Sequence, residues 1–75
     1  MIEIAPRITV DKNIRFGKPV ISGTRISVET ILGKLAIGMT YDEIMQEYEI
    51  SHEDILAVLH YASKVLSAEE IRIAG

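Results

Sequence analysis

Five of the eight basic side chains in this 75-residue sequence fall within its first 25 residues: Arg7, Lys12, Arg15, Lys18 and Arg25. The same segment holds two acidic residues, so its formal charge is +3, whereas residues 26–75 hold three basic and nine acidic residues, or −6. Guanidinium and ammonium groups pair with carboxylates and phosphates. We therefore predict that these five side chains contact an acidic partner or a phosphate. The alternative is a solvated surface with a chance bias of charge.

No combination of nucleophile, base and acid is visible in the sequence, so we predict that the protein is not an enzyme. His52 and His60 are eight residues apart, about two helical turns, which is too far for one metal ion. The adjacent acids at residues 42–43 and 53–54 are explained by helix capping and the helix dipole. The chain has no cysteine, and the Gly-x-x-x-x-Gly-Lys order of a phosphate loop is absent. The sequence thus predicts no metal and no cofactor.

The basic segment is also rich in β-branched residues. Between residues 7 and 26 these residues are interrupted by the turn-forming Gly17, Pro19 and Gly23. This pattern is typical of short strands joined by turns, and its alternation is too weak to fix a strand register.

From Ser27 onward the pattern becomes helical. Ser27 is a good N-cap, an apolar stripe of helical spacing follows it, and Gly38 is placed as a residue just past a helix end. The sequence of residues 40–43 is that of a capping box before a short second helix, and residues 51–54 repeat that signature before a longer third helix. The connection around residues 48–51 is short enough for a helix-turn-helix.

These elements predict one mainly α domain over residues 1–75: a three-helix bundle (27–75) with a strand-and-turn arm (7–26) as a short N-terminal β extension. If the helices bury their stripes on one another, the arm has little to pack on and should pair with a second copy, which predicts a homodimer. No apolar run approaches the ~18 residues of a membrane span, and a charge at Glu3 interrupts the N-terminal segment. We therefore expect a cytoplasmic protein without a membrane partner.

The third helix is a poor candidate for reading DNA. His52, Glu53 and Asp54 would stand where a helix-turn-helix meets bases and phosphates, and two carboxylates there repel a polyanion. Glu49 also occupies the turn, where glycine would most easily adopt a positive φ. If DNA is bound, the basic arm is the better contact surface.

The sequence from Ile8 to Val28, above all Gly-Lys-Pro-Val-Ile followed by Gly-Thr-Arg-Ile, resembles the short prokaryotic proteins grouped as domain-of-unknown-function family 433. The similarity extends to about residue 64. The resemblance implies a homeodomain-like three-helix bundle and a role as the antitoxin of a type II toxin–antitoxin pair, opposite a PIN-like ribonuclease toxin. A cation such as Arg25, Arg15 or Lys18 would then dock among the magnesium-binding carboxylates of the toxin. The alternatives are a stand-alone helix-turn-helix regulator that binds DNA and a structural dimer without nucleic-acid contact.

Overall fold

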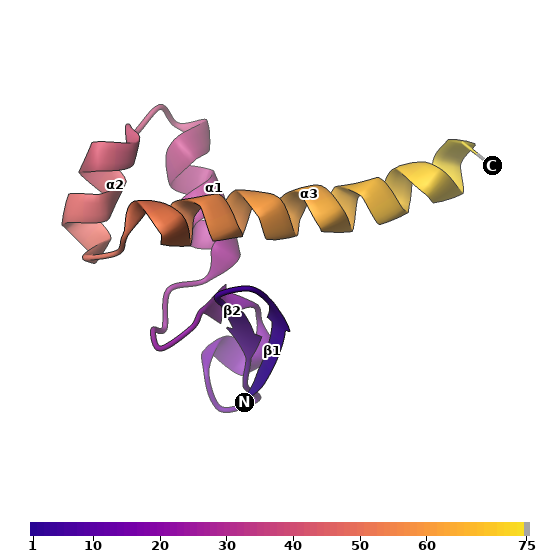
Figure 1. Cartoon of the computed structure of the whole chain (residues 1–75), viewed down its shortest axis with the longest axis horizontal. Helices are drawn as coiled ribbons and strands as arrows, with labels where there is room; N and C mark the ends of the chain where they lie inside the picture. Colours follow the sequence, from indigo (N-terminus) through magenta and orange to yellow (C-terminus); the bar gives the residue numbers. More distant parts are fainter. Residues whose placement is uncertain (75) are drawn as a thin grey trace.

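A small antiparallel sheet lies beneath three helices in the computed structural model, which describes the backbone of residues 1–74 and the side chains of residues 1–68 (Figure 1). In chain order the elements are β1 (Ile2–Ala5), β2 (Ile8–Val10), the turn η1 (Arg15–Gly17), β3 (Val20–Ile21), α1 (Val28–Ala36), α2 (Tyr41–Tyr48) and α3 (His52–Ala74). The helix α3 passes α1 and continues well beyond it (Figure 1).

The strands are ordered β1-β2-β3, and both neighbouring pairs are antiparallel. Ile8 in the central strand pairs with Ala5 of β1 and with Ile21 of β3. The register between β1 and β2 shifts between Glu3 and Ala5. The central strand thus finds both of its neighbours within the same chain.

The sheet and the helices share one hydrophobic core. Ile8 and Ile21 are 0% and 1% exposed, and they cluster with these residues of the helical part: Val28, Ile31, Ile44, Ile50, Ile55 and Val58. The predicted mainly α class is therefore wrong, because the chain is an α+β mixture of three helices and a three-stranded antiparallel sheet. The sheet is part of the fold because β2 and β3 supply Ile8 and Ile21 to the core that the helices also build. The expectation that the arm lacks a surface to pack on in its own chain was equally wrong.

The predicted helix starts are confirmed. The Ser27 hydroxyl accepts a hydrogen bond from the backbone N–H of Thr30. Thr40 and Glu43 form both bonds of a capping box, and the backbone hydrogen bond from Thr40 is the main cause of the lowered pKa of Glu43. Ser51 and Asp54 exchange the same two kinds of bond at the start of α3. These bonds satisfy N–H groups that have no partner inside a helix.

The helix ends use left-handed residues. Gly38 has φ 96°, and its N–H bonds the carbonyl of Leu35 while the N–H of Met39 bonds that of Lys34, which is the Schellman pattern. At the end of α2, Glu49 has a positive φ (55°), at the position where glycine would most easily adopt one. The last helix, α3, runs without a break from His52 to Ala74. None of the described helices combines the length and apolar character needed to span a bilayer.

Candidate functional site

The turn between β2 and β3 has an unusual backbone. Arg15, Phe16 and Gly17 all have positive φ (51°, 57° and 79°), so three consecutive residues are left-handed. Two hydrogen bonds close the turn, from Gly17 N to the carbonyl of Ile14 (3.1 Å) and from Lys18 N to that of Arg15 (3.0 Å). A left-handed conformation costs a residue with a Cβ roughly 1–2 kcal/mol, so Arg15 and Phe16 both hold strain.

The flanking residues hold this turn in place. Asp11 and Ile14 form an isolated antiparallel bridge, and the Asp11 carboxylate accepts a 2.9 Å hydrogen bond from the backbone N–H of Asn13. A bonded aspartate of this kind favours a tight turn. The strain at Phe16 is therefore imposed by a closed loop and not by a loose segment.

Phe16 is 98% exposed, although an aromatic side chain gains free energy when it is buried. Backbone strain and an exposed aromatic ring at one residue both oppose stability. Aromatic and arginine side chains are the ones that most often carry binding energy at protein interfaces. The turn thus holds the Phe16 side chain in solvent, where a partner could contact it.

Three of the predicted site residues lie close to Phe16. Lys12, Arg15 and Arg25 line a surface hollow of about 330 Å³ together with Asn13 and Phe16. The Nε of Arg15 donates a 2.9 Å hydrogen bond to the carbonyl oxygen of Arg25, which joins the strained turn to the turn that follows β3. We call these five residues the Phe16 surface.

The other two predicted site residues are engaged elsewhere. Arg7, in the β1–β2 turn, forms an ion pair with Asp54 at the start of α3 (3.0 Å), and Lys18 pairs with Glu29 in the first turn of α1. These are the ion pairs found among residues 1–68, so within that part of the chain Lys12, Arg15 and Arg25 have no acidic partner. Two of the five cations therefore connect the strand-and-turn segment to helices, and the other three are exposed.

Asp54 is held as a carboxylate by its surroundings. Burial raises its pKa, but hydrogen bonds from the backbone N–H of Ser51, the Arg7 guanidinium and the Ser51 hydroxyl outweigh this, and the net pKa is lowered. Of the three residues expected at a DNA-reading helix start, Asp54 is therefore occupied, while His52 and Glu53 are exposed. The exposed carboxylate of Glu53 keeps this end of α3 acidic.

Phe16 was not among the residues singled out by charge and spacing. The available signal was weak: it is the one phenylalanine of the chain, and it lies between turn-forming residues in a segment otherwise rich in β-branched side chains. No sequence pattern reports that such a residue will be exposed. Among the described residues, no group of three potential metal ligands converges.

The part of the chain that matches known proteins includes this surface. A family model described as "Protein of unknown function (DUF433)" matches residues 8–62, a range that includes the whole Phe16 surface. A solved structure of a DUF433 member protein from Anabaena variabilis has a similar fold, with a TM-score of 0.76 and 26% sequence identity. That match covers 92% of this chain and 69% of the other. No curated protein matches the sequence.

Proposed function

The chain belongs to the DUF433 family of proteins of unknown function, and we propose that it is a protein-binding module that acts as an antitoxin and neutralises a PIN-like ribonuclease toxin. The observation that carries the proposal is the Phe16 surface, in which three cations without an acidic partner among the described residues share a surface hollow with an almost fully exposed aromatic residue. An acidic protein pocket is the chemical complement of such a surface.

The active site of a PIN-like ribonuclease is a cluster of carboxylates that binds magnesium. An arginine placed there can bind a carboxylate through two parallel hydrogen bonds and compete with the metal ion. Arg25 and Arg15 are suited to this contact because each is exposed, and the hydrogen bond from the Arg15 side chain to the Arg25 backbone joins the two turns that carry them. Phe16 would supply the apolar anchor beside them.

The rigid turn favours binding because little conformational freedom is lost when the complex forms. The left-handed turn is closed by its own backbone hydrogen bonds, and the neighbouring bridge between Asp11 and Ile14 fixes its base. The strain within the turn is a cost to folding that a binding role would explain.

The alternative, a stand-alone DNA-binding regulator, uses the same cations on phosphates. It is the weaker proposal because Glu53 is exposed at the start of α3, while Asp54 already binds Arg7. The helix that would enter the DNA groove therefore places a carboxylate against a polyanion. The exposed phenylalanine also favours a protein surface over a phosphate backbone.

Co-expression with the product of the adjacent gene tests the proposal. We expect the two proteins to co-purify, and wild-type protein to restore growth of cells that express the toxin. Arg25→Glu and Phe16→Ser should each abolish rescue while leaving the melting temperature within a few degrees, because both side chains are exposed. Lys64→Glu is the matched control, since Lys64 is an exposed cation on α3 and should be dispensable.

Rescue by Arg25→Glu at the wild-type level would contradict the proposal. A DNA-binding role would instead appear as retardation of the upstream DNA by the protein alone. Its affinity would fall steeply with salt and be weakened by Arg25→Glu.

A further inference from the structure

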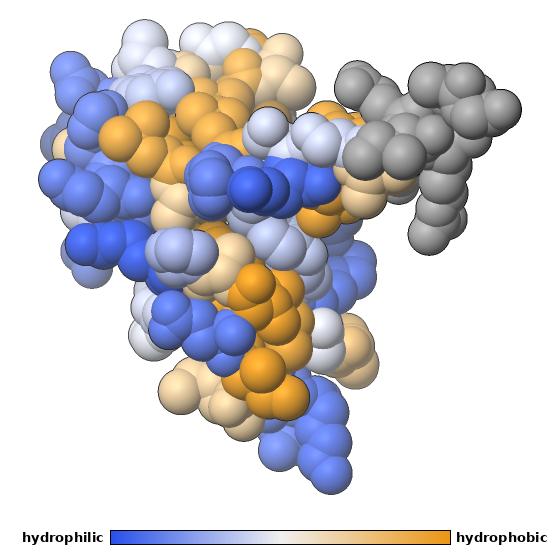
Figure 2. All heavy atoms as spheres, turned by 45° about the vertical axis from the view of Figure 1, so that its right-hand side comes forward, coloured by the Kyte–Doolittle hydropathy of each residue, from blue (hydrophilic) through white to orange (hydrophobic). Residues whose placement is uncertain are grey.

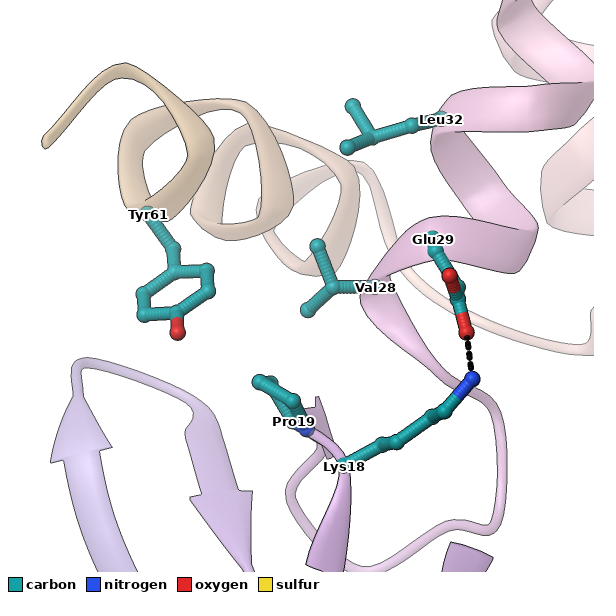
Figure 3. A pocket seen from close by; sticks show the side chains of 6 residues that line it. All are labelled: Lys18, Pro19, Val28, Glu29, Leu32 and Tyr61. Atoms are coloured by element: carbon teal, nitrogen blue, oxygen red, sulfur yellow. Dashed lines mark hydrogen bonds and ion pairs between the residues drawn. The ribbon is translucent and has the colours of Figure 1, made fainter. Parts of the chain in front are cut away.

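A continuous groove runs between α1 and α3 on a face that the proposed function does not use. It begins in a hollow of about 280 Å³ lined by Lys18, Pro19, Val28, Glu29, Leu32 and Tyr61 (Figure 3). A second hollow shares three of those residues and adds Ala62, Val65 and Leu66. A third shares Leu32, Ala62 and Leu66 and continues along α3 to Ser67. The shared residues make the three hollows one groove, which we call the α1–α3 groove.

Charge is confined to one end of this groove. Figure 3 shows Tyr61 pointing down from α3 toward Pro19, with Val28 of α1 beside them, while the ion pair of Lys18 and Glu29 lies to one side. Beyond that ion pair the groove is lined by apolar side chains and, at its far end, by the small Ser63 and Ser67. At about 100° per residue, Lys64 lies near the opposite side of α3 from Ala62. The groove therefore fits an apolar partner.

The part of α3 that forms one wall extends past the rest of the protein. Val65 and Leu66 are 42% and 58% exposed, and α3 continues beyond α1 without another element beside it (Figure 1). An isolated helix segment of this length is only marginally stable in water. Figure 2 also shows apolar side chains at the surface of both the upper, helical part and the lower part. The projecting part of α3 therefore leaves apolar side chains exposed to solvent.

The exposed area exceeds that of a compact monomer by about the area that one interface would remove. A compact monomer of 8.4 kDa is expected to expose about 4,600 Å², whereas this chain exposes 5287 Å². The excess of about 700 Å² is close to the roughly 800 Å² that each partner buries in an interface of standard size.

We propose that the occupant of the α1–α3 groove is α3 of a second copy of this chain, in a two-fold symmetric dimer. A two-fold interface requires one surface to carry both complementary shapes. Here the projecting ridge of Val65 and Leu66 and the groove beside Leu32 and Ala62 lie on the same face. Each copy therefore places its ridge in the groove of the other, as an amphipathic helix binds an apolar groove.

This interface is distinct from the dimer predicted from the sequence, in which residues 7–26 supply the contact. It also leaves the Phe16 surface free for another partner, so the dimer does not depend on the proposed antitoxin role. The two proposals are separated by substitutions on different faces of the chain.

Sedimentation equilibrium of the full chain at micromolar concentrations tests the dimer. We expect wild-type protein to sediment as a dimer, and Leu66→Arg and Val65→Asp each to weaken association at least tenfold. The matched control is Leu56→Arg: Leu56 is also a half-exposed leucine on α3 (46%), and it lies about 130° round the helix from the midpoint of Val65 and Leu66. The control should remain dimeric.

Circular dichroism of each variant establishes that it is folded, which is expected because the substituted side chains are exposed. A wild-type chain that is monomeric at about 100 times the protein concentration used for the variants would overturn the proposal. An undiminished dimer in both Leu66→Arg and Val65→Asp would overturn it too. Dissociation by Phe16→Ser, with no effect of Leu66→Arg, would assign the interface to the arm instead.

Discussion

Arg7 and Asp54, 47 residues apart in the sequence, join the β1–β2 turn to the first turn of α3 through a 3.0 Å ion pair. The Asp54 side chain is mostly buried, whereas that of Arg7 is about half exposed. The second oxygen of the same carboxylate accepts a hydrogen bond from the backbone N–H of Ser51. One carboxylate therefore both caps α3 and fixes the sheet to it.

Asp54→Ala should lower the free energy of unfolding by about 1–2 kcal/mol, because it removes a helix cap as well as the ion pair. Arg7→Ala should cost less, at most about 1 kcal/mol, because the Arg7 side chain is about half exposed to solvent. Urea unfolding measures both. Glu53→Ala is the control, since this neighbouring acid is exposed in the same helical turn. A cost for Glu53→Ala as large as that for Asp54→Ala would mean that the helix dipole, and not these contacts, explains the effect.

The contribution of Asp54 should vanish in acid. Its pKa is lower in the folded chain than its ordinary value of 3.8, so the folded state binds fewer protons than the unfolded state as the pH falls. The stabilisation is therefore complete above that value and is lost as the pH falls through the folded pKa. The free energies of unfolding of wild type and Asp54→Ala should differ at about pH 7 and converge as the pH falls well below 3.8. A difference that is independent of pH would contradict this assignment.

Phe16→Gly should preserve or raise stability. Glycine adopts φ 57° without the strain of roughly 1–2 kcal/mol, and its greater freedom in the unfolded chain offsets about 0.5–1 kcal/mol of that gain. The expected net change is a stabilisation of up to about 1.5 kcal/mol, measured by thermal unfolding. Gly17→Ala, at φ 79° in the same turn, should be destabilising. A clear loss of stability in Phe16→Gly would show that the ring contributes to the fold.

Glu49→Gly should stabilise the protein by about 0.5 kcal/mol for the same reason, because Glu49 ends α2 with φ 55°. The matched control is Glu47→Gly, another exposed glutamate, inside α2. It should instead lower stability by about 0.5–1 kcal/mol, since glycine is unfavourable in a helix interior. Equal effects of the two substitutions would contradict the left-handed geometry at residue 49.

Ile21→Ala tests whether the sheet is part of the core. Because Ile21 is 1% exposed and clusters with helical residues, the substitution should cost about 2–5 kcal/mol. Ile4→Ala, at a position of β1 that is 42% exposed, should cost much less. If Ile21→Ala leaves the unfolding of the helices unchanged, the sheet is a separate arm after all.

The local features of this chain followed from short stretches of sequence. The helix starts could be predicted because a cap needs only residues within one helical turn. The capping residues are Ser27, the Thr40–Glu43 capping box and the Ser51–Asp54 pair. The left-handed end of α2 did not follow in this way, because Glu49 stands where glycine would most easily adopt a positive φ and adopts φ 55° nonetheless. The cationic character of the first third of the chain also required only a count of charges.

The tertiary structure decided what those residues do together. Burial of Ile8 and Ile21 against the helices depends on a match between two apolar surfaces, and neither surface is visible in a local pattern. The same long-range packing brought Arg7 to Asp54 and Lys18 to Glu29, and left Lys12, Arg15 and Arg25 beside an exposed Phe16. Sequence reports which side chains can pair, but ion pairing and exposure depend on distances across the fold, which only the packed chain fixes.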